Sequence, residues 1–193
     1  MTSDNGGQEG RGAAAGHKVN GDLRGAKGTA WEGGHRVPFL VRWPGKVAAG
    51  TTSVETICHV DFMATICAAL DIALPGNAGP DSWNVLPAWL GEPASRPLRE
   101  ATVCVGRNSL VYSIRRGPWK ILATDSGEYR EVRPGTKDVR ESLSAPQLFD
   151  LASDPSEQRN LATTNPDRFQ ELAVLLAKYR TQDHSRPGWQ TPR

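Results

Sequence analysis

Short apolar stretches alternate with long polar connections along this chain of 193 residues. Residues 37–43 form a short apolar run closed by a Pro-Gly pair, which is typical of a buried strand. From Val60 the apolar positions recur at helical spacing, and Asp61 lies in the first turn, where the helix dipole favours a carboxylate. The pattern therefore predicts a strand and then a helix, with a second, shorter helical turn at residues 86–90.

The second half of the chain has several short β-like segments followed by one amphipathic helix. Asn165 and Pro166 supply an N-cap and a proline at the first helical position, and five apolar side chains follow on one face. This order indicates a small α+β layer. Residues 125–145 form a polar excursion, and the chain from Gln182 is expected to fray. The predicted strands are residues 101–105, 110–115, 119–124 and 147–151.

Composition and charge exclude several classes of function. The net charge of +2 comes from 23 basic and 21 acidic residues that are well mixed, so neither nucleic acid nor an anionic membrane is an expected partner. No apolar run approaches the ~20 residues that span a bilayer. The first ten residues lack the features of a secretion signal, which leaves the compartment open, with export or a periplasmic location kept as an option. The three cysteines, Cys58, Cys67 and Cys104, have no C-x-x-C spacing, which favours free thiols.

Two glycine-rich segments near the N-terminus carry candidate chemistry. Residues 3–7 read SDNGG, and residues 23–38 read LRGAKGTAWEGGHRVP. Asp4 and Asn5 place a charged and a neutral oxygen side by side, which suits a hard cation, and the isolated Lys27 suits an oxyanion. The same residues also read as a common surface turn and a solvated loop lysine. The spacing of a phosphate-binding loop, G-x-x-x-x-G-K-[ST], is not met.

The order of these segments resembles the C-terminal part of the type I sulfatases, the arylsulfatase-like members of the alkaline-phosphatase-like superfamily. SDNGG is followed by K-G-T-x-x-E-G-G-x-R-V-P and by an apolar run that ends in Trp-Pro-Gly. Residues 61–66 match the helix motif D-hydrophobic-x-P-T-hydrophobic, with alanine in place of proline. Residues 115–121 match R-x-G-x-(W/Y)-K-hydrophobic, and residues 148–161 match L-(Y/F)-D-L-x-x-D-P-x-E-x-x-N-L.

The resemblance implies an α/β fold in two parts. Residues 1–95 are expected to be the C-terminal part of the large α/β catalytic domain. Residues 96–193 are expected to form the small α+β domain, with an antiparallel sheet and one packed helix. The proline-rich stretch at residues 92–97 marks the expected boundary.

The resemblance also assigns roles to three residues, and a fourth is a candidate from its place in the loop between them. Asp4 and Asn5 correspond to two calcium ligands, and Lys27 corresponds to the lysine that contacts a sulfate oxygen in the transition state. His17, between these segments, is a candidate general acid or specificity contact at the leaving group.

Three other charged residues in the second segment are expected to be structural. Glu32 and Arg36 flank a Gly-Gly pair and are predicted to fold back into an ion pair that fixes the loop before residues 37–43. His35 is expected to pack or to support the site.

The catalytic nucleophile of the family is absent from the sequence. Its C-x-P/A-x-R motif, whose cysteine becomes the attacking formylglycine, is not matched by CHVDF, CAALD or CVGRN. We therefore expect the chain alone to be inactive, and we expect upstream DNA to encode an Asp-Asp pair and that motif. A sulfated small molecule or carbohydrate is the expected substrate, with the ester and the oligomeric state left open.

Two other interpretations remain. A phosphodiesterase or phosphonate hydrolase of the same superfamily has similar metal ligands, and serine or threonine at the nucleophile position would favour it. The K-G-T-x-x-E-G-G-x-R-V-P segment favours the sulfatases. A non-catalytic orphan fragment is the third interpretation, and unrelated upstream sequence would favour it.

Overall fold

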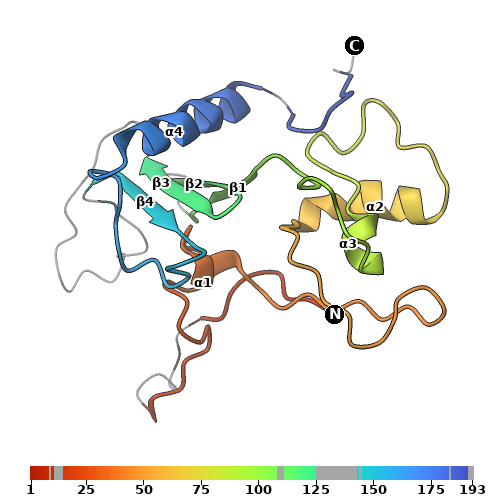
Figure 1. Cartoon of the computed structure of the whole chain (residues 1–193), viewed down its shortest axis with the longest axis horizontal. Helices are drawn as coiled ribbons and strands as arrows, with labels where there is room; N and C mark the ends of the chain where they lie inside the picture. Colours follow the sequence, from red (N-terminus) through yellow and green to blue (C-terminus); the bar gives the residue numbers. More distant parts are fainter. Residues whose placement is uncertain are drawn as a thin grey trace. The chain divides into compact units, whose positions relative to one another are not determined.

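The computed structural model describes residues 1–8, 10, 15–107, 111–124, 143, 145–182 and 184–190 (Figure 1). The predicted polar excursion at residues 125–145 lies almost entirely outside them. The chain divides into two compact units, each built from separate segments. Unit 1 comprises Met1–Phe39 and Val103–Leu176, and unit 2 comprises Leu40–Thr102 and Ala177–Arg193. The domain boundary expected near residue 95 stays a prediction.

A four-stranded sheet forms the centre of unit 1, with its strands in the order β1-β2-β3-β4. Both β2–β3 and β3–β4 are antiparallel. The sheet therefore confirms the antiparallel layer predicted from the second half of the chain. The strands are β1 (Thr102–Val105), β2 (Val111–Arg116), β3 (Trp119–Thr124) and β4 (Gln147–Asp150).

One face of this sheet carries the predicted C-terminal helix, α4 (Pro166–Thr181) (Figure 1). The register pairs Arg116 with Trp119, so these two side chains share that face. The Arg168 guanidinium lies 5.6 Å from the centre of the Trp119 ring, and Glu171 lies 3.0 Å from Arg116. The leucines that α4 buries are Leu172, Leu175 and Leu176.

The opposite face of the sheet receives the N-terminal segment. Because side chains alternate along β3, Lys120 and Leu122 both point to this side. Leu122 packs in a buried cluster, with Trp31 against it. Directly after Trp31 comes the four-residue helix α1 (Glu32–His35). The buried cluster consists of Ala30, Val111, Leu122, Leu143, Phe149 and Leu151.

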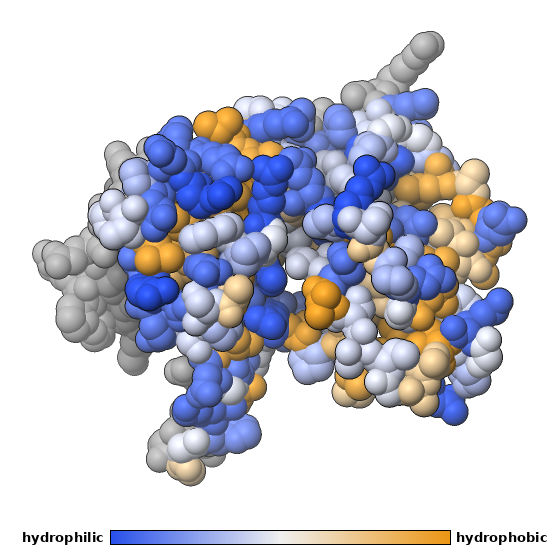
Figure 2. Space-filling view, viewed as in Figure 1, coloured by the Kyte–Doolittle hydropathy of each residue, from blue (hydrophilic) through white to orange (hydrophobic). Residues whose placement is uncertain are grey.

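Unit 2 contains the predicted helices as η2 (His59–Asp61), α2 (Phe62–Ala69) and α3 (Leu86–Leu90). Two apolar side chains of the predicted helical face are exposed, however: Met63 is 51% exposed and Leu70, just beyond the helix, is 63% exposed. Figure 2 shows hydrophobic side chains gathered on the surface of this part of the molecule. Small residues are buried instead, because α2 approaches residues 82–85 closely through hydrogen bonds from Ala64 to Ser82 and from Val85 to Thr65.

Two local predictions are wrong. Residues 37–43 do not form a strand: only Phe39 pairs, in an isolated bridge with Thr2. A strand needs a ladder of partners along its length, and Thr2 supplies a single one. The chain beyond Gln182 is not frayed over residues 184–190, because the Arg186 guanidinium donates to several backbone carbonyls of unit 2 and the backbone N–H of Gln190 donates to Gly76.

The cysteines agree with the expectation from their spacing. Cys58, Cys67 and Cys104 are free thiols, each partly buried. Within the described ranges no helix has the length and apolar character needed to cross a membrane.

Candidate functional site

Residues 3–7, called the N-terminal turn below, are held against α1 by a very close backbone approach. The backbone N–H of Gly6 donates to the Gly34 carbonyl at 2.9 Å. A Cβ atom at Gly6 would lie 1.8 Å from the Gly33 carbonyl oxygen, so no other residue fits there. The Asn5 amide nitrogen donates to the Gly6 carbonyl at 2.9 Å, which leaves its carboxamide oxygen available. The Asp4 side chain is exposed.

Residues 24–29, called the lysine loop, lie directly beside this turn. The Lys27 N–H donates to the Gly7 carbonyl at 3.0 Å. Asn20 clamps the two segments, because its amide donates to the carbonyls of both Gly7 and Gly25 at 3.1 Å while its oxygen accepts the Gly7 N–H at 2.7 Å. The Lys27 side chain is exposed. The structure thus brings the segments of Asp4, Asn5 and Lys27 together through their backbones.

Asn20 was missed by the sequence reasoning, since a single asparagine in a glycine-rich loop carries no distinguishing signal. His17 is exposed on the stretch between the two segments. No hydrogen bond or ion pair joins His17 to Asp4, Asn5 or Lys27 in the part of the chain that the structure describes. Its predicted role at the leaving group stays a prediction.

The N-terminal turn fits a calcium ion as part of a coordination shell. Asp4 and Asn5 offer one carboxylate and one carboxamide, which is the oxygen chemistry that calcium prefers, but calcium takes about six to eight such ligands. Among the described residues, no group of three or more His, Cys, Asp or Glu side chains converges to hold a metal. The donor type therefore fits, and Asp4 and Asn5 would supply two of the ligands.

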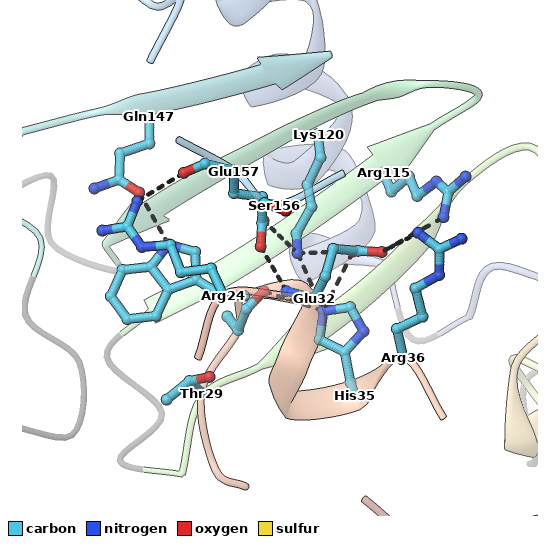
Figure 3. A network of polar contacts seen from close by, with 12 residues as sticks. Arg24, Thr29, Glu32, His35, Arg36, Arg115, Lys120, Gln147, Ser156 and Glu157 are labelled. Carbon is cyan, nitrogen blue, oxygen red and sulfur yellow. Dashed lines mark hydrogen bonds and ion pairs between the residues drawn. The ribbon is translucent and has the colours of Figure 1, made fainter. Parts of the chain in front are cut away.

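Glu32, Lys120 and Glu157, called the buried triad, lie on the sheet side of α1 (Figure 3). The Lys120 ammonium is 2.9 Å from Glu32 Oε1 and 2.8 Å from Glu157 Oε1. His35 Nε2 lies 3.2 Å from the same nitrogen. An ammonium has three N–H donors, and this one contacts the two carboxylates. His35 Nε2 also lies 3.1 Å from the Ala30 carbonyl and accepts from Lys120 only in the tautomer without a proton on that nitrogen. Because all three triad side chains are at most 1% exposed, water contributes little to their solvation.

Glu32 also makes the predicted ion pair. Its Oε2 lies 3.5 Å from Arg36 and 3.8 Å from Arg115, so the Glu32–Arg36 prediction is confirmed. The closer partner, Lys120, was not anticipated, although it is the lysine of the R-x-G-x-(W/Y)-K-hydrophobic motif. Glu157 is the glutamate of the D-P-x-E motif, and nothing in either motif indicates that the two residues meet.

The three titratable neighbours of Lys120 respond differently to this environment. Burial disfavours the charge of Glu32, but the attraction of Lys120 and Arg115 and the hydrogen bond from Lys120 outweigh it, and the pKa of Glu32 lies below its usual value. Burial raises the pKa of Glu157, and Lys120 offsets this only in part. Burial, and next the repulsion of Lys120, lowers the pKa of His35 to about 4, so its ring is neutral at pH 7.

The loop after β4 presents Glu157 in an unusual backbone conformation. Glu157 has φ of 53°, in the left-handed region that residues other than glycine rarely adopt. The Asp154 carboxylate accepts the N–H groups of Gln158 and Arg159, and Asn160 accepts the N–H of Leu148. These bonds hold the loop while Glu157 points into the buried triad.

Comparisons with known proteins agree with the motifs. A family profile described as Sulfatase matches residues 1–72. The chain is 35% identical to an N-acetylgalactosamine-6-O-sulfatase of Bacteroides thetaiotaomicron over 86% of its length, and 31% identical to human arylsulfatase A over 91% of its length. A solved structure from B. thetaiotaomicron glycosaminoglycan metabolism superposes on 94% of the chain, with a TM-score of 0.79 and 34% identity.

In each case the chain covers about a third of the other protein: 32% and 36% of the two relatives, and 38% of the solved structure. The antiparallel sheet with its packed helix is therefore shared with one part of a larger sulfatase fold. With the motifs, the profile match and the fold in agreement, the chain belongs to the sulfatase family.

Proposed function

We propose that this chain is the C-terminal part of a calcium-dependent sulfatase that hydrolyses a sulfate monoester to an alcohol and sulfate. The observation that carries the proposal is the pairing of the N-terminal turn with the lysine loop. Asp4 and Lys27 are both exposed, and their backbones are tied together through Gly7. Opposite charges held on adjacent rigid segments suit a cation and an oxyanion bound side by side.

Each candidate residue has a defined task in this proposal. Asp4 and Asn5 supply two oxygen ligands to calcium, which when bound adds positive charge next to the sulfate oxygens. Lys27 reaches a sulfate oxygen and stabilises the negative charge that grows there in the transition state. His17 faces the leaving-group oxygen and donates a proton to it or selects the alcohol. The attacking formylglycine and the other calcium ligands come from outside this chain.

A sulfated carbohydrate is the substrate class that the relatives favour. The similar protein from B. thetaiotaomicron is named for the 6-O-sulfate of N-acetylgalactosamine, and the similar solved structure comes from glycosaminoglycan metabolism. Human arylsulfatase A is named for aryl sulfates. The phosphodiesterase or phosphonate hydrolase alternative has no comparable support, because K-G-T-x-x-E-G-G-x-R-V-P is a sulfatase pattern.

The first experiment tests whether the chain alone is inactive. Purified residues 1–193 are incubated with an aryl sulfate and calcium, and released alcohol is followed. Turnover above a buffer blank would show that the chain carries its own nucleophile and would contradict the proposal.

The second experiment tests Lys27 in a completed enzyme, made by fusing the chain to the formylglycine-bearing part of the B. thetaiotaomicron relative. Lys27→Ala is expected to lower kcat on the order of 100-fold, since it removes a contact that strengthens in the transition state. Lys18→Ala is the matched control, because Lys18 is an exposed lysine of the same region that pairs with Asp22. Unchanged kinetics of Lys27→Ala would remove the sulfate-contact role, and faster cleavage of an aryl phosphonate than of an aryl sulfate would favour the alternative.

A further inference from the structure

The buried triad joins three segments that are far apart in the sequence. Glu32 belongs to α1, Lys120 to β3 and Glu157 to the loop after β4. Removing three charged side chains from water is costly, and apolar residues of similar size often stabilise a core equally well. Glu157 in addition occupies a strained backbone conformation. Stability alone therefore does not account for this arrangement.

Glu157 holds α1 through both of its carboxylate oxygens. Oε1 contacts the Lys120 ammonium at 2.8 Å, and Oε2 accepts the backbone N–H of Glu32 at 2.6 Å. Lys120 in turn contacts the Glu32 side chain at 2.9 Å. The backbone and the side chain of the first residue of α1 are thus both fixed to the sheet of unit 1 (Figure 3).

The glycines of α1 then fix the two candidate segments with no side chain in between. A Cβ atom at Gly34 would lie 2.1 Å from the Thr29 carbonyl oxygen, and one at Gly33 would lie 2.4 Å from that of Gly25. The lysine loop therefore rests directly on α1. On the other side, Gly34 accepts the Gly6 N–H. Such direct backbone contacts leave little freedom for the N-terminal turn to shift when α1 stays in place.

We propose that Lys120 and Glu157 are positioning residues: through Glu32 and α1, they set where the N-terminal turn and the lysine loop stand. The inference rests on the proposed role of Asp4 and Asn5 as cation ligands. In this arrangement the sheet of the small C-terminal layer sets the geometry of the site, although in the described part of the chain Lys120 and Glu157 make no hydrogen bond or ion pair with Asp4, Asn5 or Lys27.

The experiment measures backbone amide exchange by NMR in residues 1–193. Lys120→Met removes the nearest cation of two buried carboxylates and can prevent folding, so the main variant is Lys120→Met with Glu157→Gln, which removes one charge of each sign. The matched control is Arg116→Met with Glu171→Gln, an exposed ion pair on the other face of the sheet. The reporting amides are those of Gly6 and Lys27, and the reference amides are those of β2 and β3.

In the main variant, exchange at Gly6 and Lys27 is expected to rise on the order of 100-fold while the reference amides change by less than about 3-fold. The control leaves all of them unchanged. Glu157→Gln alone keeps an oxygen that accepts the Glu32 N–H, and it is expected to retain most of the protection. Unchanged exchange at Gly6 and Lys27 would overturn the proposal. An equal rise at the reference amides would also overturn it, since the triad would then support only global stability.

A calcium titration separates this inference from the proposed function. Calcium chloride is added to the completed enzyme of the second experiment, which supplies the other calcium ligands, while the amide shifts of Asp4 and Asn5 are followed. If these shifts do not move, the cation role fails, and the exchange data still decide the positioning role. If they move in the wild type and the main variant binds calcium equally well, the proposed function stands and the positioning role is wrong.

Discussion

Buried carboxylates occur in both units, and the two units satisfy them in different ways. Asp61 of unit 2 is 1% exposed, and one nitrogen of Arg99 contacts its two oxygens at 2.7 and 2.8 Å. The backbone N–H groups of Cys58 and Trp83 donate to the same carboxylate at 2.7 and 3.1 Å. In unit 1, Glu32 and Glu157 instead share the single ammonium of Lys120.

The two units therefore differ in how many donors stabilise each buried carboxylate: Asp61 has several donors of its own, whereas Glu32 and Glu157 share one ammonium. Asp61 keeps two backbone donors when any one side chain is changed, so its cost of burial is spread over several groups. In the buried triad Lys120 is the nearest cation to both carboxylates. Without it, Glu32 keeps only the longer contacts to Arg36 and Arg115, and Glu157 keeps the backbone N–H of Glu32. Unit 1 should therefore respond more strongly to substitution of its buried cation than unit 2 does.

The largest expected effect is that of Lys120→Met on stability. The variant should lose about 3–5 kcal/mol of unfolding free energy, since two buried charges lose their partner. Urea unfolding of residues 1–193 measures the loss, with Arg116→Met as an exposed control on the same sheet. A loss similar to that of the control would mean that the carboxylates are solvated by other groups.

A smaller loss is expected for Arg99→Met in unit 2. We expect about 2–3 kcal/mol, because the backbone donors of Cys58 and Trp83 still stabilise the Asp61 charge. Arg96→Met, at an exposed position in the same connection, is the control. A loss in Arg99→Met that exceeds that of Lys120→Met would reverse the comparison between the two units.

Acid should weaken unit 1 through His35. The pKa of this ring is about 4 in the folded protein, against 6.5 for an unperturbed histidine, so between these pH values the unfolded chain binds a proton that the folded chain does not. The unfolding free energy should thus fall by about 3 kcal/mol as the pH drops through this window.

The other two groups act in opposite directions. The lowered pKa of Glu32 gives stability at higher pH that is lost as the pH falls below its unfolded value, and the raised pKa of Glu157 removes stability as the pH rises. His35→Gln should flatten the pH dependence between pH 6.5 and 4, measured by urea unfolding at several pH values, whereas the exposed His17→Gln should not. An unchanged slope in His35→Gln would assign the acid sensitivity to the carboxylates.

Sequence patterns predicted the helices and the strands of the sheet better than they predicted the segments whose conformation depends on contacts with distant residues. The strands of the sheet and α4 follow from alternation and helical spacing, which are local properties. The strand expected at residues 37–43 did not form, because a strand needs neighbouring strands to pair with, and the local apolar pattern does not show whether these are present. The fixed conformation of residues 184–190 depends on Arg186 meeting carbonyls about a hundred positions earlier, which a polar tail sequence does not reveal.

The candidate site shows the same division. The motifs indicated Asp4 and Asn5 as oxygen ligands for a cation and Lys27 as a contact for an oxyanion, and these roles stay predictions. The contact between Glu32 and Lys120 spans 88 positions, and that between Glu32 and Glu157 spans 125. Each of these residues stands in a recognisable motif, yet their meeting depends on strand register and on the direction of side chains from β3.

The smallest expected effect is that of Lys27→Ala on the stability of the chain alone. Lys27 is exposed and its side chain takes part in no hydrogen bond or ion pair among the described residues, so the unfolding free energy should change by less than about 0.5 kcal/mol. Lys27→Ala and Lys120→Met together compare the loss of an exposed lysine with the loss of a buried lysine in the same unit. Urea unfolding of both variants under one condition measures it. A loss above about 1 kcal/mol for Lys27→Ala would mean that this lysine supports the loop, and a fall in kcat of the completed enzyme could then no longer be assigned to a lost sulfate contact.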